Sequence, residues 1–374
     1  MRVQDLALQR DKYKHLSDEQ WRWFLQQVEG RERTADKLPT FAALEDWWYP
    51  VRLSCEQCSS ELTARYKAQI LSSFTSHLST FLDLTAGYGV DTYFLSERFE
   101  HTDYVEQNAE LCRIAAHNFS LIDNRKSIIV HNTTAEEFFK TAGQYDLIFA
   151  DPARRNNYGG RVFRLEDSTP NVVELLPTLL EHLTPEGRLL LKLSPMLDIS
   201  QAVKELSAVN WNIYVVAVKN EVKEVLLLSG GDGIITAIDL AEPEKAFVFT
   251  REEEQNIPSS FHLSPFTFLY EPSAAILKAG AYKLVAQRFG LQKLDVNTHL
   301  YASDSLVENF PGRVWKIVNN QELKANSQAN IVCRNYPLTP EQLKKKLRLK
   351  DGGDLYIIGC RVNGKPTLFT AERI

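Results

Sequence analysis

Residues 81–92, FLDLTAGYGVDT, constrain the fold more than any other stretch of the chain. They predict an apolar strand that ends in an acid, Asp83, then a turn with Gly87 and Gly89, then the start of a helix. Thr92 stands where the third glycine of a dinucleotide-binding turn would be. A carboxylate in this place repels a pyrophosphate and attracts a cation. The turn therefore favours a cationic ligand, and S-adenosylmethionine, which carries an ammonium and a sulfonium, suits it.

A regular alternation of strands and helices surrounds this turn. Between residues 80 and 240, apolar runs alternate with amphipathic ones, which predicts a parallel sheet with helices on both faces. The last two runs, 223–230 and 233–240, have no helix between them, so we expect an antiparallel hairpin at the sheet edge. Residues 1–75 predict helices, with a capping box at Ser17. The predicted fold class is α/β: a Rossmann-like doubly wound sheet with an antiparallel edge hairpin, an N-terminal helical layer and a smaller C-terminal α/β (α+β) module.

Four polar features lie at the predicted carboxyl ends of strands, where doubly wound sheets bind their ligands. Asp83 ends the first strand, and Glu106 ends the second, 23 residues later, at the spacing of an acid that accepts both ribose hydroxyls. Asn132 and Thr134 follow the third strand, where a polar group could meet an adenine. Asp151 ends the fourth. A single acid at a strand end is more often a helix cap or a turn former, but four polar features in this order predict one binding site.

These motifs resemble those of the class I S-adenosylmethionine-dependent methyltransferases, and in particular bacterial RNA methyltransferases. FLDLTAGYGVD is similar to their motif I, YVEQN to motif II and ADPAR to motif IV, while residues 59–67 resemble the element that precedes motif I. The C-terminal region resembles the ferredoxin-like and THUMP-like modules of a bacterial family of this kind. The resemblance implies S-adenosylmethionine as cofactor. It implies this cofactor-binding set: Lys67, Asp83, Thr85, Gly87, Gly89, Asp91, Glu106, Asn132 and Thr134.

The acceptor side of the predicted site is the segment from Asp151 to Arg161. Methylation of C5 of a pyrimidine needs a cysteine nucleophile near motif IV, and the chain has no cysteine between Cys112 and Cys333, which argues against C5 chemistry. Transfer to nitrogen or oxygen needs an aligned lone pair. We therefore expect the catalytic set to be Asp151, Arg154 and Arg155, with Arg161 holding substrate. The alternative for these arginines is a solvated loop that pairs with Glu166 and Asp167. Ala153 and Arg154 stand where amino-group methyltransferases usually have a proline and an aromatic residue.

Charge is distributed unevenly along the chain. The formal net charge is −5, yet residues 262–374 carry 16 basic and 9 acidic side chains, a net charge of +7. Within them, residues 343–350 read LKKKLRLK and predict a basic helix. A charge run is usually a solvated face, but here it suits an RNA backbone, so we expect substrate contacts from Lys344, Lys345, Lys346 and Arg348.

The predicted domains are residues 1–75, a helical region; 76–245, the methyltransferase domain; 260–325, a small ferredoxin-like module; and 326–374, a THUMP-like basic β-α-β-β module. Residues 241–261 are acidic and end in a breaker, so we expect a linker there.

The predicted location is the cytoplasm. Five scattered cysteines fit a reducing compartment, and no apolar run approaches the roughly 18 residues of a membrane span. Cys55 and Cys58 form a single C-x-x-C without a second pair, so we expect two packed thiols and no metal site. RNA is the expected partner.

The predicted function is N-methylation of a nucleobase in ribosomal or transfer RNA. Two alternatives stay open: a methyltransferase that acts on a protein or small molecule, and a non-enzymatic RNA-binding protein with a vestigial cofactor fold. The sequence leaves the target nucleotide and the oligomeric state open.

Overall fold

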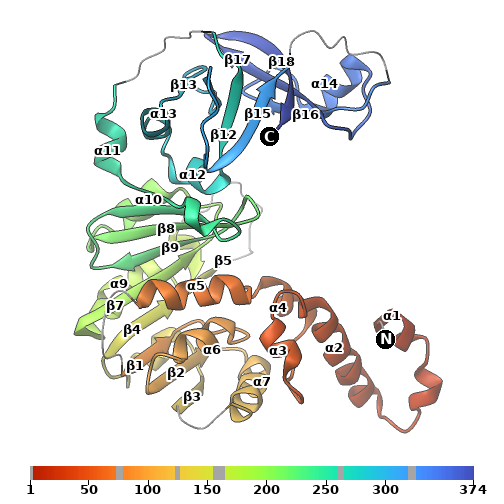
Figure 1. Ribbon diagram of the computed structural model, residues 1–374. Helices are drawn as coiled ribbons and strands as arrows, with labels where there is room; N and C mark the ends of the chain where they lie inside the picture. Colours follow the sequence, from red (N-terminus) through yellow and green to blue (C-terminus); the bar gives the residue numbers. More distant parts are fainter. Residues whose placement is uncertain (1–2, 73–78, 123–126, 155–164, 259–264, 319–325) are drawn as a thin grey trace. The chain divides into compact units, whose positions relative to one another are not determined.

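The computed structural model describes residues 3–72, 79–122, 127–154, 165–258, 265–318 and 326–374, without the side chain of Arg154. It divides into two compact units (Figure 1). The first comprises Met1–Asn210 and Leu226–Gly230, and the second comprises Trp211–Val225 and Gly231–Ile374.

The N-terminal part of the first unit is helical. Its elements are α1 (Val3–Ala7), the 3₁₀ helix η1 (Arg10–Tyr13), α2 (Asp18–Thr34), α3 (Pro39–Ala43), α4 (Arg52–Gln57) and α5 (Glu61–Leu71). The predicted capping box is confirmed, because the Ser17 hydroxyl accepts from the Gln20 N–H while the Gln20 side chain accepts from the Ser17 N–H. Aromatic side chains such as Phe41 and Trp47 are buried in one cluster with Tyr88 and Phe94. These helices therefore share a core with the segment that follows β1.

A nine-stranded sheet contains the predicted parallel core. Its order is β11-β10-β8-β9-β7-β4-β1-β2-β3. Parallel pairing joins β1 (Thr80–Asp83) to β2 (His101–Glu106) and β4 (Tyr145–Ala150), β2 to β3 (Ser127–Asn132), and β4 to β7 (Leu183–Leu193). The intervening helices are α6 (Val90–Ser96), α7 (Ala109–Ser120), α8 (Ala135–Phe138), α9 (Val172–Glu181) and α10 (Ile199–Glu205). Short strands β5 (Ala153–Arg154) and β6 (Ser168–Thr169) form a separate pair. The α/β fold class is confirmed.

The antiparallel edge is formed by different strands from those predicted. Strands β8 (Trp211–Val218) and β9 (Glu221–Ser229) are joined through Lys219 and Asn220, both with positive φ, as in a tight hairpin turn. Strand β10 (Ile234–Asp239) pairs with β8 in parallel, and β11 (Phe247–Thr250) pairs antiparallel with β10 at the edge. The predicted linker over 241–261 is thus wrong for the residues of β11 and of α11 (Arg251–Asn256), because Phe247 and Phe249 alternate inward and are buried.

A second sheet of seven strands, in the order β13-β14-β12-β15-β18-β17-β16, lies in the second unit. The elements are β12 (Phe268–Pro272), α12 (Ala274–Ala279), α13 (Lys283–Phe289), β13 (Gln292–Lys293), β14 (Tyr301–Ser303), β15 (Gly312–Ile317), β16 (Asn330–Arg334), α14 (Pro340–Leu347), β17 (Leu355–Val362) and β18 (Lys365–Arg373). Leu269 and Leu300 share one buried cluster with Trp315, Ile358 and Ala371. The two predicted C-terminal modules therefore contribute to one core, and their boundary stays a prediction.

Candidate functional site

The glycine turn after β1 adopts the conformation that its residues predict. Gly87 has φ 56° and Gly89, which precedes α6, has φ 81°, in the left-handed region that favours glycine. A Cβ built on Gly89 would lie 2.8 Å from Phe119 Cζ, so this position has both a conformational and a steric reason to be glycine. The turn brings Asp83, at the end of β1, beside the first turn of α6.

Asp83 is fully buried. Its Oδ2 accepts a 2.6 Å hydrogen bond from the Thr92 hydroxyl, and its Oδ1 accepts a 3.3 Å bond from the Thr85 N–H. Burial raises the pKa of Asp83 to about 8, the neighbouring charges of Asp91 and Asp151 raise it further, and the two hydrogen bonds oppose the shift. Asp83 is therefore mainly protonated at neutral pH, and a bound cation would favour its ionised form.

Glu106 ends β2 and crosses to the glycine turn. Its Oε2 accepts from the Gly87 N–H at 3.0 Å, and its Oε1 accepts from the Asn108 N–H at 2.7 Å. The side-chain amide of Asn132 donates to the backbone carbonyls of Glu106 and Gln107. Asn132 therefore links β3 to the end of β2, and its amide is engaged with the backbone.

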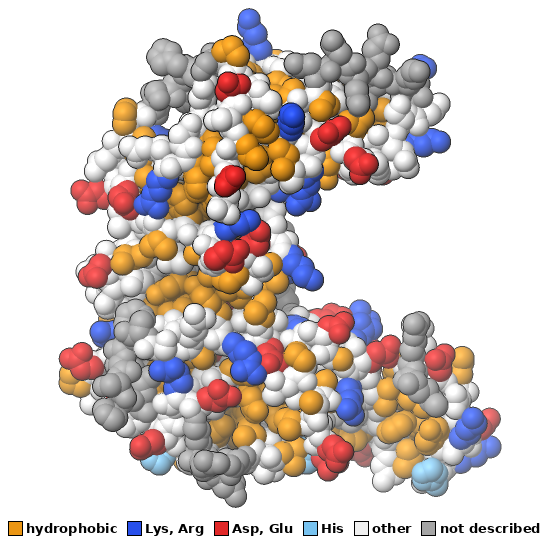
Figure 2. All heavy atoms as spheres, viewed as in Figure 1, with side chains coloured by type: hydrophobic (Ala, Val, Ile, Leu, Met, Phe, Trp, Pro, Cys, Tyr) orange, Lys and Arg blue, Asp and Glu red, His pale blue; other side chains and the backbone are white. Residues whose placement is uncertain are grey.

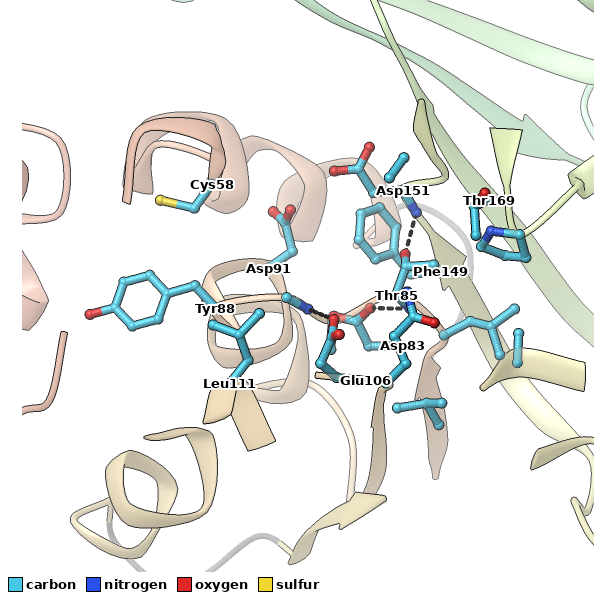
Figure 3. Close-up of a pocket in the computed structure, with 18 of the residues that line it drawn as sticks. Cys58, Asp83, Thr85, Tyr88, Asp91, Glu106, Leu111, Phe149, Asp151 and Thr169 are labelled. Atoms are coloured by element: carbon cyan, nitrogen blue, oxygen red, sulfur yellow. Dashed lines mark hydrogen bonds between the residues drawn. The ribbon is translucent and has the colours of Figure 1, made fainter. Parts of the chain in front are cut away.

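These strand ends line a cavity of about 360 Å³, within the size range of small-molecule sites. Figure 3 shows Asp83, Thr85, Glu106, Asp91 and Asp151 around it. Of the predicted cofactor residues, those that line it are Asp83, Thr85, Gly87, Asp91, Glu106 and Thr134. Gly89, Asn132 and Lys67 lie outside the lining. Further walls come from α4 and its C-terminus, through Ser54, Gln57 and Cys58, and from Thr169 and Pro170.

Lys67 does not line the cavity itself, but it contacts Asp91, which does. Its side chain is fully buried on α5, with Nζ 3.2 Å from Asp91 Oδ1 and 3.4 Å from Ser59 Oγ. The Ser59 hydroxyl donates to Asp91 Oδ2 at 2.6 Å. Asp91 Oδ1 is buried and accepts no hydrogen bond from the described residues, although it forms the 3.2 Å ion pair with Lys67 Nζ. A buried carboxylate oxygen with unused capacity at a cavity wall fits a ligand that donates N–H or O–H groups.

Asp151, the predicted catalytic acid, follows β4 at the edge of the same cavity. Its backbone N–H donates to the Thr85 hydroxyl at 2.6 Å, and its Oδ2 forms an ion pair with Lys192 Nζ, at the end of β7. The side chain is 37% exposed, so the carboxylate is both held and accessible. Of the predicted arginines, Arg155 and Arg161 lie outside the described residues, as does the Arg154 side chain.

Comparison with known proteins identifies the family. A crystal structure from Porphyromonas gingivalis W83, described as a methyltransferase, is 33% identical, matches 96% of this chain and 92% of that chain, and superimposes with a TM-score of 0.83. The chain belongs to the family of S-adenosylmethionine-dependent methyltransferases. An uncharacterised S-adenosylmethionine-dependent methyltransferase of Mycobacterium tuberculosis H37Rv is 22% identical over 91% of this chain and 92% of its own length. Family models match a ferredoxin-like domain at residues 268–311 and a THUMP domain-like region at residues 313–373.

The cofactor of this methyltransferase is S-adenosylmethionine, which supplies an electrophilic methyl group on a sulfonium. The cavity fits such a cationic ligand, because the acidic side chains of Asp83, Asp91 and Glu106 line it and the buried Asp91 Oδ1 accepts no hydrogen bond from the described residues. Among the described residues, no cluster of three or more His, Cys, Asp and Glu side chains could hold a metal ion. No helix in the described ranges has the length and apolar character of a bilayer span.

The basic run of the methyltransferase is shorter as a helix than predicted. Helix α14 ends at Leu347, and Arg348 follows it with φ 52°, so Arg348 is a C-cap residue outside the helix. Lys345 and Lys346 are exposed, whereas Lys344 is half-buried and pairs with Asp351. On the face shown in Figure 2, basic and acidic side chains are interspersed over the C-terminal region.

Two residues of the site are not predicted from the sequence. The glycine pattern marks Thr92 only as a missing glycine, yet its hydroxyl binds Asp83. Lys192 interrupts the apolar run of Leu189–Leu191 and Leu193, yet it pairs with Asp151. A charged residue at the carboxyl end of such a strand is the available signal for Lys192, as it is for Asp83.

Proposed function

We propose that this methyltransferase transfers a methyl group from S-adenosylmethionine to a nitrogen of a nucleobase in ribosomal or transfer RNA. The observation that carries the proposal is the position of Asp151, which follows a buried strand at the edge of the cofactor cavity. A carboxylate there can accept a hydrogen bond from an amine and orient its lone pair toward a methyl donor.

On the cofactor side, we propose that Asp83, Asp91 and the glycine turn face the charged part of S-adenosylmethionine, and that Glu106 accepts from the ribose hydroxyls. Glu106 already accepts two backbone N–H groups, which hold its carboxylate in one orientation. A carboxylate can accept about four hydrogen bonds, so capacity remains for a diol. Thr134 lines the same cavity and also caps α8 through the Glu137 N–H.

RNA as acceptor is supported by the THUMP domain-like match at residues 313–373 and by the exposed Lys345 and Lys346 on α14. Such cations contact phosphate without reading sequence. A protein or small-molecule acceptor is the alternative, in which the C-terminal region has a structural role.

The test is incubation of bulk RNA with isotopically labelled S-adenosylmethionine, followed by digestion and nucleoside analysis. We expect a labelled N-methylated nucleoside. Asp151→Asn should lower the single-turnover rate roughly 10²-fold, the effect of losing a positioned acid–base group, with unchanged cofactor affinity and a folded protein by circular dichroism. Glu186→Gln, a change of an exposed acid on β7, is the matched control. Label in protein alone, or Asp151→Asn at the wild-type rate, would contradict the proposal.

A further inference from the structure

Lys192 and Asp151 meet because of the register between two parallel strands. Strands β4 and β7 pair with Ala150 opposite Leu191. The residues that follow these two in the chain are Asp151, just after β4, and Lys192, still on β7. The Lys192 side chain is 13% exposed and its Nζ pairs with Asp151 Oδ2. The lysine end of this ion pair is shielded from water whereas the Asp151 end is 37% exposed, so solvent weakens the pair less than a fully exposed surface pair.

Both the backbone and the side chain of Asp151 are held in place. Its N–H donates to Thr85 Oγ1, Pro152 restricts the backbone on the other side, and Lys192 holds one carboxylate oxygen. The second oxygen, Oδ1, makes no hydrogen bond with other described residues. Lys192 also acts electrostatically on the cavity wall: burial raises the pKa of the Cys58 thiol, and the Lys192 charge opposes that shift.

We propose that Lys192 is a positioning residue for methyl transfer, which holds the Asp151 carboxylate in an orientation in which its other oxygen faces the acceptor. The inference rests on the role assigned to Asp151 in the proposed function. It also bears on the acceptor class. The ammonium of Lys192 balances the charge of Asp151, so the pair has no net charge to attract a cationic group such as a protonated protein lysine, whereas Asp151 Oδ1 can still accept from a neutral N–H donor such as a nucleobase amine.

A double-mutant cycle tests whether Lys192 acts through Asp151. The variants are Lys192→Met, Asp151→Asn and the two combined, with single-turnover methyl transfer to RNA as the readout. We expect Lys192→Met to lower the rate roughly 10- to 100-fold, as small misplacements of catalytic groups do, with little change in KM or cofactor affinity. In the Asp151→Asn background the same substitution should cause little further loss. Lys192→Arg, which keeps the charge, should recover most of the rate.

Lys204→Met, at an exposed lysine on α10, is the control and should leave the rate unchanged. Losses that multiply in the double variant would overturn the inference, because Lys192 would then act independently of Asp151. A wild-type rate in Lys192→Met would overturn it as well.

A failure of this inference can be distinguished from a failure of the proposed function. If the wild-type protein methylates no RNA, the proposed function fails, whereas the pairing is still tested by thermal melting of the same four proteins. Melting midpoints that shift additively would show that the two side chains do not interact and would overturn the inference. Non-additive shifts, together with RNA methylation by the wild type that each single variant slows, would support both.

Discussion

The buried carboxyl of Asp83 makes cofactor binding dependent on pH. Its pKa is raised to about 8, mainly by burial, so at pH 6.5 it is mostly protonated in the free protein. If the cation of S-adenosylmethionine binds beside the ionised form, close to one proton should be released for each cofactor bound. At pH 6.5 the α-amino group of the ligand is almost fully protonated, because such groups titrate near pH 7.7–8.0, so it adds little to the proton count at that pH.

Isothermal titration calorimetry in buffers of different ionisation enthalpy measures this proton count. Wild type should release nearly one proton at pH 6.5, and its affinity should rise roughly tenfold per pH unit between pH 5.5 and 7.5. Asp83→Asn should release none through this site and lose that pH dependence. Equal proton release by the two proteins, or a wild-type affinity indifferent to pH, would refute the reasoning.

The same group affects stability in the absence of ligand. The folded pKa of Asp83 lies above the unfolded value of about 3.9, so its contribution to stability is fully present below pH 4 and is lost as the pH rises through about 8. The free energy of unfolding should therefore fall by up to roughly 1.4 kcal/mol per pH unit across that window. Denaturant titrations of wild type and Asp83→Asn should differ in this slope, and parallel pH profiles would contradict the assignment.

Four further changes test the site and the RNA contacts. Thr92→Val removes a hydrogen bond that lowers the pKa of Asp83, so the rise in cofactor affinity should move to higher pH in the calorimetric titration. Glu106→Gln should weaken the cofactor about tenfold through loss of charge-assisted bonds, and an unchanged dissociation constant would exclude Glu106 from the ribose site. Gly89→Ala should lower the free energy of unfolding by roughly 1–3 kcal/mol in a denaturant titration, because Gly89 has a positive φ and an added Cβ would meet Phe119. Gly143→Ala should leave stability unchanged, because a Cβ there would meet nothing within 4 Å. Replacing Lys345 and Lys346 by Ala should make the plot of log RNA affinity against log salt concentration shallower. The expected change in slope is about 0.7 for each single-strand phosphate that is no longer neutralised. The control Lys316→Ala, at an exposed site on β15, should leave the slope unchanged.

Local sequence determined the parts of this protein that depend on backbone preference and on short-range periodicity. The strand that ends at Asp83, the positive φ at Gly87 and Gly89, and the capping box at Ser17 are each encoded within about ten residues. The shared edge of the parallel strands then predicted which strand ends would meet, and Asp83, Glu106 and Asp151 do line one cavity.

Only the tertiary structure decided which side chains pair within that cavity. Lys192 reaches Asp151 because of the register between β4 and β7, and the Asn132 amide is engaged by backbone carbonyls of the neighbouring strand end. Residues 247–250 lie between acidic segments, yet they form an edge strand because they pair with β10. Strand register and pairing partners depend on contacts between residues far apart in the chain, so the local pattern of one strand does not determine them by itself.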